Sequence, residues 1–134
     1  MAAIEEIEGI GSALGEKLAS LGVRTTEALL ERAGTRAGRR HLAAEVGVSE
    51  QQVLEWVNRA DLMRIKGVGE EYSHLLEAAG VDSPAELARR AAATLHGTLE
   101  RLNAERKLVR RVPTLKEVER WVQEAKGLLR LVTH

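Results

Sequence analysis

Two short glycine hairpins contain the residues of this sequence whose type and spacing could bind a ligand. Gly9-Ile10-Gly11 lies directly before one predicted helix, and Gly67-Val68-Gly69 lies directly before another. Glycine reaches backbone angles that a Cβ atom forbids, and the first amide groups of a helix have no partner within it. Each hairpin could therefore present N–H groups to a phosphate oxygen. Lys66, which precedes the second hairpin, would add a positive charge.

Basic side chains gather at corresponding places in the two halves of the chain. The candidates for contact with a polyanion are Arg36, Arg39, Arg40, Arg106, Lys107, Arg110 and Arg111. On a helix, Arg36 and Arg40 are one turn apart and can form one positive face. Such clusters either form a solvated surface or contact phosphates, and the second role predicts binding that weakens as salt is added.

Acidic side chains oppose phosphate binding at both hairpins. Glu8 directly precedes the first hairpin, and Glu70-Glu71 directly follow the second. Two carboxylates in the first turn of a helix interact favourably with the helix dipole, by roughly 0.3–1 kcal/mol each, but they repel an incoming phosphate. The alternative is therefore that the glycines only close a tight turn between packed helices.

No group of residues in the sequence has the spacing of a catalytic or metal site. The four histidines are far apart and do not form the His-x-x-x-His pattern that binds zinc on a helix. Ser73 and His74 are adjacent, so a helix would direct them to different faces, which does not suit a nucleophile and its base. The sequence has no cysteine, which excludes disulfides and thiolate metal sites. We expect a protein that is not an enzyme and that uses no metal, cofactor or small-molecule substrate.

An internal repeat must position these residues. Ile7-Glu8-Gly9-Ile10-Gly11 recurs 58 residues later as Ile65-Lys66-Gly67-Val68-Gly69. The offset is 65 residues between Trp56 and Trp121, so the second copy has gained seven residues, near positions 100–113. A repeat of this length indicates that each copy is one supersecondary unit. We expect a first unit at residues 1–63 and a second at 64–134, packed as one compact body.

Each unit is expected to contain four helices. The chain is rich in Ala, Leu, Glu and Arg, which favour helices, and it predicts an all-α fold with no sheet. The expected helices lie at about 12–21, after Thr25, at about 36–46, after Ser49, at about 70–79, after Ser83, at about 95–109 and after Thr114. Ser49-x-x-Gln52, Ser83-Pro84-Ala85-Glu86 and Thr114-x-x-Glu117 are typical of capping boxes at helix starts.

The last helix and the two tryptophans supply candidate core residues. One apolar stripe is formed by Leu115, Val118, Val122, Ala125, Leu129 and Val132. We expect this stripe to pack into the core of its unit, and a seam between two copies of the chain is the alternative. Trp56 and Trp121 are expected in the core of the repeat, with exposed binding anchors as their alternative role.

Both hairpins resemble the helix-hairpin-helix motif, in which an apolar-Gly-apolar-Gly turn is followed by a small residue and then by Leu. The small residues are Gly15 and Ser73, and the leucines are Leu18 and Leu76. From Ile4 to about Leu131 the chain resembles an uncharacterised bacterial family of tandem helix-hairpin-helix proteins, the domain of unknown function 4332. The likeness is most specific at Lys107-Leu108-Val109-Arg110-Arg111-Val112-Pro113. It implies two tandem four-helix units, similar to SAM-domain-like helical repeats, and implies no established activity.

The charge balance leaves two functions open. Lys plus Arg and Asp plus Glu number 20 each, which is not the basic excess expected of a protein that binds nucleic acid, although residues 64–134 carry a net charge of +3. One expectation is a module that binds the backbone of DNA or RNA without reading its sequence. The other is a protein-interaction module or homodimer in which the hairpins are purely structural. The sequence has no long apolar run and no signal peptide, so we expect no membrane span and a cytoplasmic location.

Overall fold

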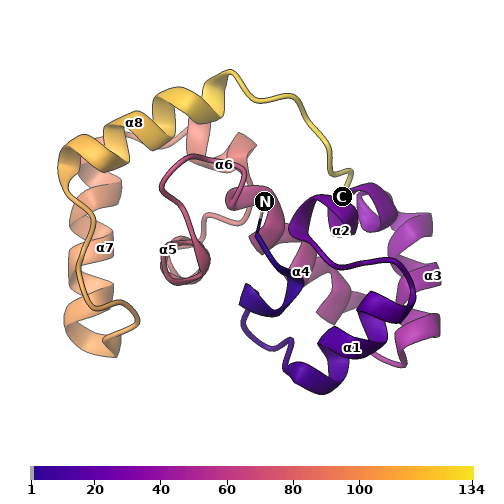
Figure 1. Cartoon of the computed structure of the whole chain (residues 1–134). Helices are drawn as coiled ribbons and strands as arrows, with labels where there is room; N and C mark the ends of the chain where they lie inside the picture. Colours follow the sequence, from indigo (N-terminus) through magenta and orange to yellow (C-terminus); the bar gives the residue numbers. More distant parts are fainter. Residues whose placement is uncertain (1) are drawn as a thin grey trace. The chain divides into compact units, whose positions relative to one another are not determined.

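A computed structural model describes residues 2–134 of the chain. The chain forms two compact units, the first running to Asp61 and also containing Arg130–His134, and the second formed by Leu62–Leu129 (Figure 1). The described residues form eight α-helices and no strand, with one isolated β-bridge between Ala3 and Thr25. The expected all-α fold is confirmed. Across residues 2–134, every helix is too short or too polar to cross a bilayer.

The first unit begins with a short 3-10 turn, and hydroxyl groups cap the starts of its second, third and fourth helices. Its elements are η1 (Ile4–Glu6), α1 (Ser12–Ser20), α2 (Thr26–Ala33), α3 (Arg36–Val46) and α4 (Glu50–Leu62). The hydroxyl of Thr25 accepts the Ala28 N–H at 3.1 Å and starts α2. The hydroxyl of Thr35 does the same for α3, accepting from Gly38 at 3.1 Å. Such caps satisfy amide groups that have no partner inside the helix.

The second unit repeats this order of helices. Its elements are α5 (Glu70–Ala78), α6 (Pro84–Ala88), α7 (Ala92–Arg106) and α8 (Leu115–Lys126). Helices α6 and α7 both pack against α8, as Figure 1 shows. The core of the unit contains Leu75, Leu76 and Leu99, each with 0% of its surface exposed, together with Trp121. Burial of these apolar side chains holds the helices together.

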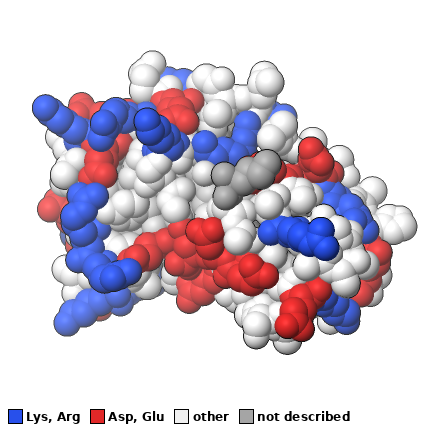
Figure 2. Space-filling model, in the orientation of Figure 1, with Lys and Arg blue, Asp and Glu red and all other residues white. Residues whose placement is uncertain are grey.

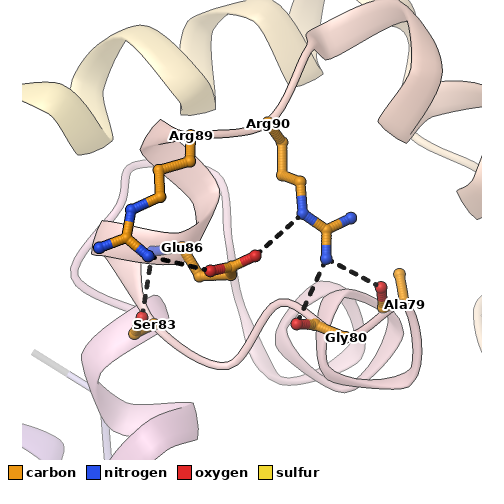
Figure 3. A network of polar contacts seen from close by, with 6 residues as sticks. All are labelled: Ala79, Gly80, Ser83, Glu86, Arg89 and Arg90. Carbon is orange, nitrogen blue, oxygen red and sulfur yellow. Dashed lines mark hydrogen bonds and ion pairs between the residues drawn. The ribbon is translucent and has the colours of Figure 1, made fainter.

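One of the three expected capping boxes is complete. At α8 the Thr114 hydroxyl accepts the Glu117 N–H at 3.1 Å, and the Glu117 carboxylate accepts the Thr114 N–H at 2.9 Å. At α6 the Ser83 hydroxyl accepts the Glu86 N–H, and in the described part of the chain the Glu86 carboxylate pairs with two arginines and does not return a bond to Ser83 (Figure 3). At α4 only the bond from the Gln52 N–H to the Ser49 hydroxyl is present among the described residues.

Helix α7 lies three residues earlier than expected. The sequence predicts a helix at about 95–109, whereas α7 spans Ala92–Arg106. The helix ends because Lys107 adopts a left-handed conformation with φ 53°. The residues after Lys107 form a loop. The Asn103 side chain holds this loop in place, because it donates to the Val109 C=O and accepts from the Val109 N–H.

The apolar stripe of the last helix is shorter than expected. Val118, Val122 and Ala125 are buried, which confirms that they pack into the core rather than form a seam. The helix ends at Lys126, so Leu129 and Val132 do not continue the stripe, and their assignment to it was wrong. Leu129 is 80% exposed, whereas Val132 is 1% exposed and belongs to the first unit. Gly127 follows the helix as its C-terminal cap, with φ −99°.

The tail segment, Arg130–His134, completes the first unit. The Thr133 N–H donates to the Gly34 carbonyl at 2.9 Å, and the Arg39 Nη2 donates to the Thr133 carbonyl at 2.6 Å. A Cβ atom on Gly34 would lie 2.6 Å from the Leu131 carbonyl oxygen. Position 34 therefore has to be glycine for the two backbones to approach so closely.

Candidate functional site

The two glycine hairpins have the same backbone conformation. Gly9 has φ +93° and Gly67 has φ +89°, a left-handed region that favours glycine. The turn is closed by a bond from the Ile10 N–H to the Ile7 carbonyl in the first unit, and by the equivalent bond from Val68 in the second. The second glycine of each hairpin is extended and has no side chain to cap the helix that follows.

A tryptophan lies behind each hairpin. Trp56 is 2% exposed and Trp121 is 3% exposed, which confirms both as core residues. A Cβ atom placed on Gly9 would lie 3.8 Å from the Trp56 Nε1, and one placed on Gly67 would lie 3.3 Å from the Trp121 Nε1. The repeat therefore preserves a contact between the left-handed glycine and an indole ring from the last helix of the same unit.

Carboxylates surround the first hairpin. Glu8, directly before it, is exposed, and its carboxylate lies 3.5 Å from the Arg59 guanidinium. The Glu5 side chain lies against α1, because a Cβ atom on the buried Gly15 would be 2.7 Å from it. The first hairpin therefore presents negative charge beside its helix start, where a phosphate would need positive charge.

The second hairpin opens on a depression of about 400 Å³. The residues that line it are Gly67, Gly69, Glu70, Glu71, Tyr72, Arg110 and Arg111. Two of the sequence-predicted basic residues, Arg110 and Arg111, thus lie beside the two sequence-predicted glycines. Lys66, Arg106 and Lys107 are exposed but do not line the depression. Val68 is 3% exposed and packs into the core.

The loop added to the second unit positions the two arginines. Asn103 in α7 bonds to Val109 at 2.9 and 3.1 Å, which fixes the residue before Arg110. The Tyr72 hydroxyl in α5 donates to the Arg111 carbonyl at 2.8 Å. Each end of the Arg110-Arg111 pair is therefore tied to a different helix of the second unit.

Each arginine of the depression already has a carboxylate partner. The Arg110 guanidinium lies 3.3 Å from the Glu71 carboxylate, with 93% of the Arg110 side chain exposed. The Arg111 guanidinium donates two bonds to Glu117, at 2.9 and 3.0 Å. These bonds from Arg111, with the Thr114 N–H bond, lower the pKa of Glu117 to about 2. The same pairing raises the pKa of Arg111.

Basic residues continue along one edge of the second unit. Residues 101–126 contain eight Lys or Arg against four Glu. Figure 2 shows Lys and Arg along the left edge of the view, over α7, the loop that follows it, and α8. The Lys66 backbone N–H lies 3.3 Å from both Glu124 carboxylate oxygens, so acidic charge interrupts the basic side chains near the hairpin.

The basic cluster of the first unit is split between surface and core. Arg36 and Arg40 are exposed, but Arg39 is only 4% exposed, so the expectation of a surface cation at position 39 was wrong. Arg39 donates to the carbonyls of Ala33 and Gly34 at 3.1 and 2.9 Å and to the carbonyl of Thr133. Burial lowers the pKa of Arg39, because desolvation disfavours the charged form.

Arg32 and Arg90 occupy equivalent positions in the two units, and they were not identified from the sequence. Arg32 donates to the Leu21 carbonyl at 2.9 Å, just beyond the end of α1. Arg90, 58 residues later, donates to the equivalent Ala79 carbonyl at 3.5 Å, just beyond the end of α5 (Figure 3). The repeat offset carries one arginine onto the other and could have revealed them. Tyr72 and Asn103 have no such signal, because their partners lie in the loop that only the second unit has.

Comparison with known proteins identifies a family without assigning an activity. The family described as "Domain of unknown function (DUF4332)" matches residues 8–128. Neither the curated proteins nor the solved structures give a match. The arrangement of residues in the chain itself therefore has to carry any functional conclusion.

Proposed function

The chain belongs to the DUF4332 family, and we propose that it is a cytoplasmic, non-catalytic binding module that contacts the backbone of DNA or RNA without reading sequence. The contact is made by the second unit. The observation that carries the proposal is the depression in which Gly67 and Gly69 lie beside Arg110 and Arg111. Its two arginines lie on an edge of the unit that is rich in Lys and Arg.

The carboxylate partner of Arg110 is replaceable by phosphate. An exposed ion pair contributes only about 0–1 kcal/mol, because water screens it and both side chains lose freedom. Arg110 is almost fully exposed, so its pair with Glu71 belongs to this class. A guanidinium bonds phosphate with two parallel N–H groups, and a nucleic acid offers many phosphates at once. Exchange of Glu71 for a phosphate at Arg110 therefore costs little.

The hairpin has a positioning role in this proposal. Glu70 and Glu71 lie in the first turn of α5, where their charge opposes phosphate at the uncovered amides. The positive charge comes instead from the added loop, which Tyr72 and Asn103 fix beside the hairpin. In this proposal the phosphate is therefore bound by arginine side chains that lie beside the hairpin, and not by the backbone amides of the hairpin itself.

A protein partner or a second copy of the chain is the alternative ligand. It is favoured by the exposure of apolar side chains at the end of the second unit, where Leu129 is 80% exposed. The acidic surroundings of the first hairpin also suit a protein partner better than a phosphate. Self-association predicts a sedimentation mass twice that of the chain, whereas a monomer that binds nucleic acid supports the first proposal.

Binding to duplex and single-stranded DNA and RNA at two salt concentrations tests the proposal. We expect affinity to fall as salt rises, and the Arg110→Glu/Arg111→Glu variant to lose at least about tenfold, since each phosphate contact adds to the salt dependence. The matched control is Lys17→Glu/Arg24→Glu, which changes the charge equally at two exposed basic residues of the first unit.

Two outcomes contradict the proposal. Binding that is undetectable or insensitive to salt rules out a backbone contact. An equal loss in both double variants shows that only total charge matters. Because Arg111→Glu also removes the partner of Glu117, Arg110→Gln is the second test variant. It leaves the Arg111 pair intact and should still weaken binding.

A further inference from the structure

A second depression, of about 380 Å³, lies in the first unit and is separate from the proposed interface. The residues that line it are Arg36, Arg39, Glu50, Gln51, Leu54 and His134. They come from the first turns of α3 and α4 and from the tail segment. Its volume lies in the range of about 300–1,000 Å³ that is typical of small-molecule sites.

Arg39 has unused hydrogen-bond donors at this depression. A guanidinium has five N–H groups. Three bonds are present among the described residues, two from Nη1 to Ala33 and Gly34 and one from Nη2 to Thr133. An N–H on Nε and another on Nη2 remain, and these two nitrogens form one edge of the guanidinium fork. In residues 2–134 no buried side-chain nitrogen or oxygen lacks a partner, so the unbonded Nε must reach solvent.

The charge of Arg39 is also only partly compensated. Its three partners are carbonyl oxygens, and residues 2–134 provide it with no ion pair within 4.0 Å. Glu50 is the one acidic side chain among the residues that line the depression, and it lies 3.9 Å from Arg40, which is outside it. Arg36 adds a second guanidinium, and this one is exposed. A buried cation without a close anion favours binding of one from solution.

We propose that this depression is a binding site for a phosphate group, held by the free edge of Arg39 and by Arg36. Two parallel N–H groups match two phosphate oxygens, and Arg36 supplies further charge. Gln51 adds an amide donor to the lining, and Leu54 provides an apolar wall. A phosphate ion occupies only part of about 380 Å³, so a phosphate ester with a small organic group is the class of ligand that fills the site.

Titration of the full chain with inorganic phosphate and with phenyl phosphate, at constant ionic strength, tests the proposal. Calorimetry gives the affinity, and amide chemical shifts locate the site. We expect shifts in α3, α4 and the tail segment, with tighter binding of the ester. Chloride at the same ionic strength should produce none of these shifts.

Three single variants test whether phosphate affinity falls when positive charge is removed from the depression and rises when negative charge is removed. Arg36→Gln should weaken phosphate binding by roughly two- to fivefold, and Glu50→Gln should strengthen it by a similar factor, as expected of partly exposed charges. Arg24→Gln changes the charge of the same unit equally to Arg36→Gln, away from the depression, and should leave the affinity unchanged. Equal effects of Arg36→Gln and Arg24→Gln would overturn the proposal, as would the absence of binding at millimolar phosphate.

A test of the free edge of Arg39 has to distinguish a loss of phosphate binding from a loss of folding. Arg39→Lys keeps the charge but removes the fork and some bonds to the carbonyls, so its unfolding free energy must be measured beside its affinity. Loss of affinity in a folded Arg39→Lys supports the site, and unchanged affinity overturns it. The Arg110→Glu/Arg111→Glu variant should bind phosphate here normally, which separates this site from the proposed nucleic-acid contact.

Discussion

The two hairpins share a backbone and differ in what surrounds it. In both units a left-handed glycine packs against the tryptophan of the last helix, and an extended glycine leaves the next helix uncapped. Beside the first hairpin lies Glu8, paired with Arg59, whereas beside the second lie Arg110 and Arg111. Duplication has thus preserved the buried geometry, while the surface charges have diverged.

The seven added residues explain most of this divergence. In the first unit Gly47 ends α3 in a left-handed conformation, and α4 begins three residues later. In the second unit Lys107 takes the left-handed position at the end of α7, and the loop continues to Thr114. Arg110 and Arg111, which line the depression beside the second hairpin, lie in this loop, so their charges belong to the insertion rather than to the repeat.

Removal of either tryptophan should have the largest effect on stability. Trp56→Ala and Trp121→Ala each delete a buried ring behind a hairpin, and each should lower the free energy of unfolding by about 3–5 kcal/mol. Chemical denaturation followed by circular dichroism provides the measurement. A small effect of one variant beside a large effect of the other would show that the two positions are not structurally equivalent.

Removal of the two bonds between the Asn103 side chain and Val109 should have the second largest effect on stability, and this effect should be confined to the second unit. Asn103→Ala leaves the Val109 N–H and C=O without their partner and should cost about 1–3 kcal/mol. Asn103→Asp keeps the acceptor but loses the donor, so we expect an intermediate loss. Amide hydrogen exchange should accelerate at Val109. Equal acceleration at Val48, in the shorter loop of the first unit, would contradict a local role.

Substitution of the first glycine of each hairpin by alanine should destabilise the protein more than substitution of the second glycine. Gly67→Ala and Gly9→Ala place a side chain at positive φ and should cost about 1–2 kcal/mol. The loss should be greater for Gly67, where the new Cβ lies 3.3 Å from the indole nitrogen rather than 3.8 Å. Gly69→Ala and Gly11→Ala are matched controls, since both residues are extended and have open space around them. Equal losses at all four positions would argue against a conformational cause.

Acid should weaken the second unit by the smallest amount. The pKa of Glu117 is lowered to about 2 by Arg111 and Thr114, below its ordinary value of 4.5. Because the folded state favours the charged form, its stabilisation is present above about pH 4.5 and is lost as pH falls towards 2. Solvent screening limits the effect to about 1 kcal/mol or less.

The first unit provides the comparison for this titration. Gln52 occupies the position equivalent to Glu117 and carries no charge. Glu117→Gln should therefore reduce the dependence of unfolding free energy on pH between 2 and 4.5, measured by denaturation at a series of pH values. An unchanged pH dependence in this variant would show that other carboxylates are responsible.

Local signals in the sequence predicted the helices and hairpins well. Thr25 and Thr114 accept bonds at helix starts as expected, because a cap depends only on residues three positions apart. The repeat offset located both tryptophans in the core. The end of α7 could not be predicted, because it depends on the Asn103 side chain and on a left-handed lysine.

Long-range contacts set the limit of prediction for the candidate sites. Arg39 belonged by sequence to a surface cluster, and only the carbonyl of Thr133, 94 residues away, together with its local carbonyl partners, gives it a buried place. The charges of Arg110 and Arg111 were visible, but their pairing with Glu71 and Glu117 depends on how the loop returns to α5 and α8. Spacing identified which residues could bind a polyanion but not which of them were already paired.

The tail segment reverses the order in which the two units can be finished during synthesis. Domains generally fold from the N-terminus as the chain leaves the ribosome. Here the Gly34 carbonyl and the Arg39 guanidinium form their bonds to Thr133 only after Thr133 has been translated, which is later than every residue of the second unit. The unit that emerges first is therefore the last to acquire all of its hydrogen bonds, and a chain that ends before Arg130 would contain every residue of the second unit but not of the first.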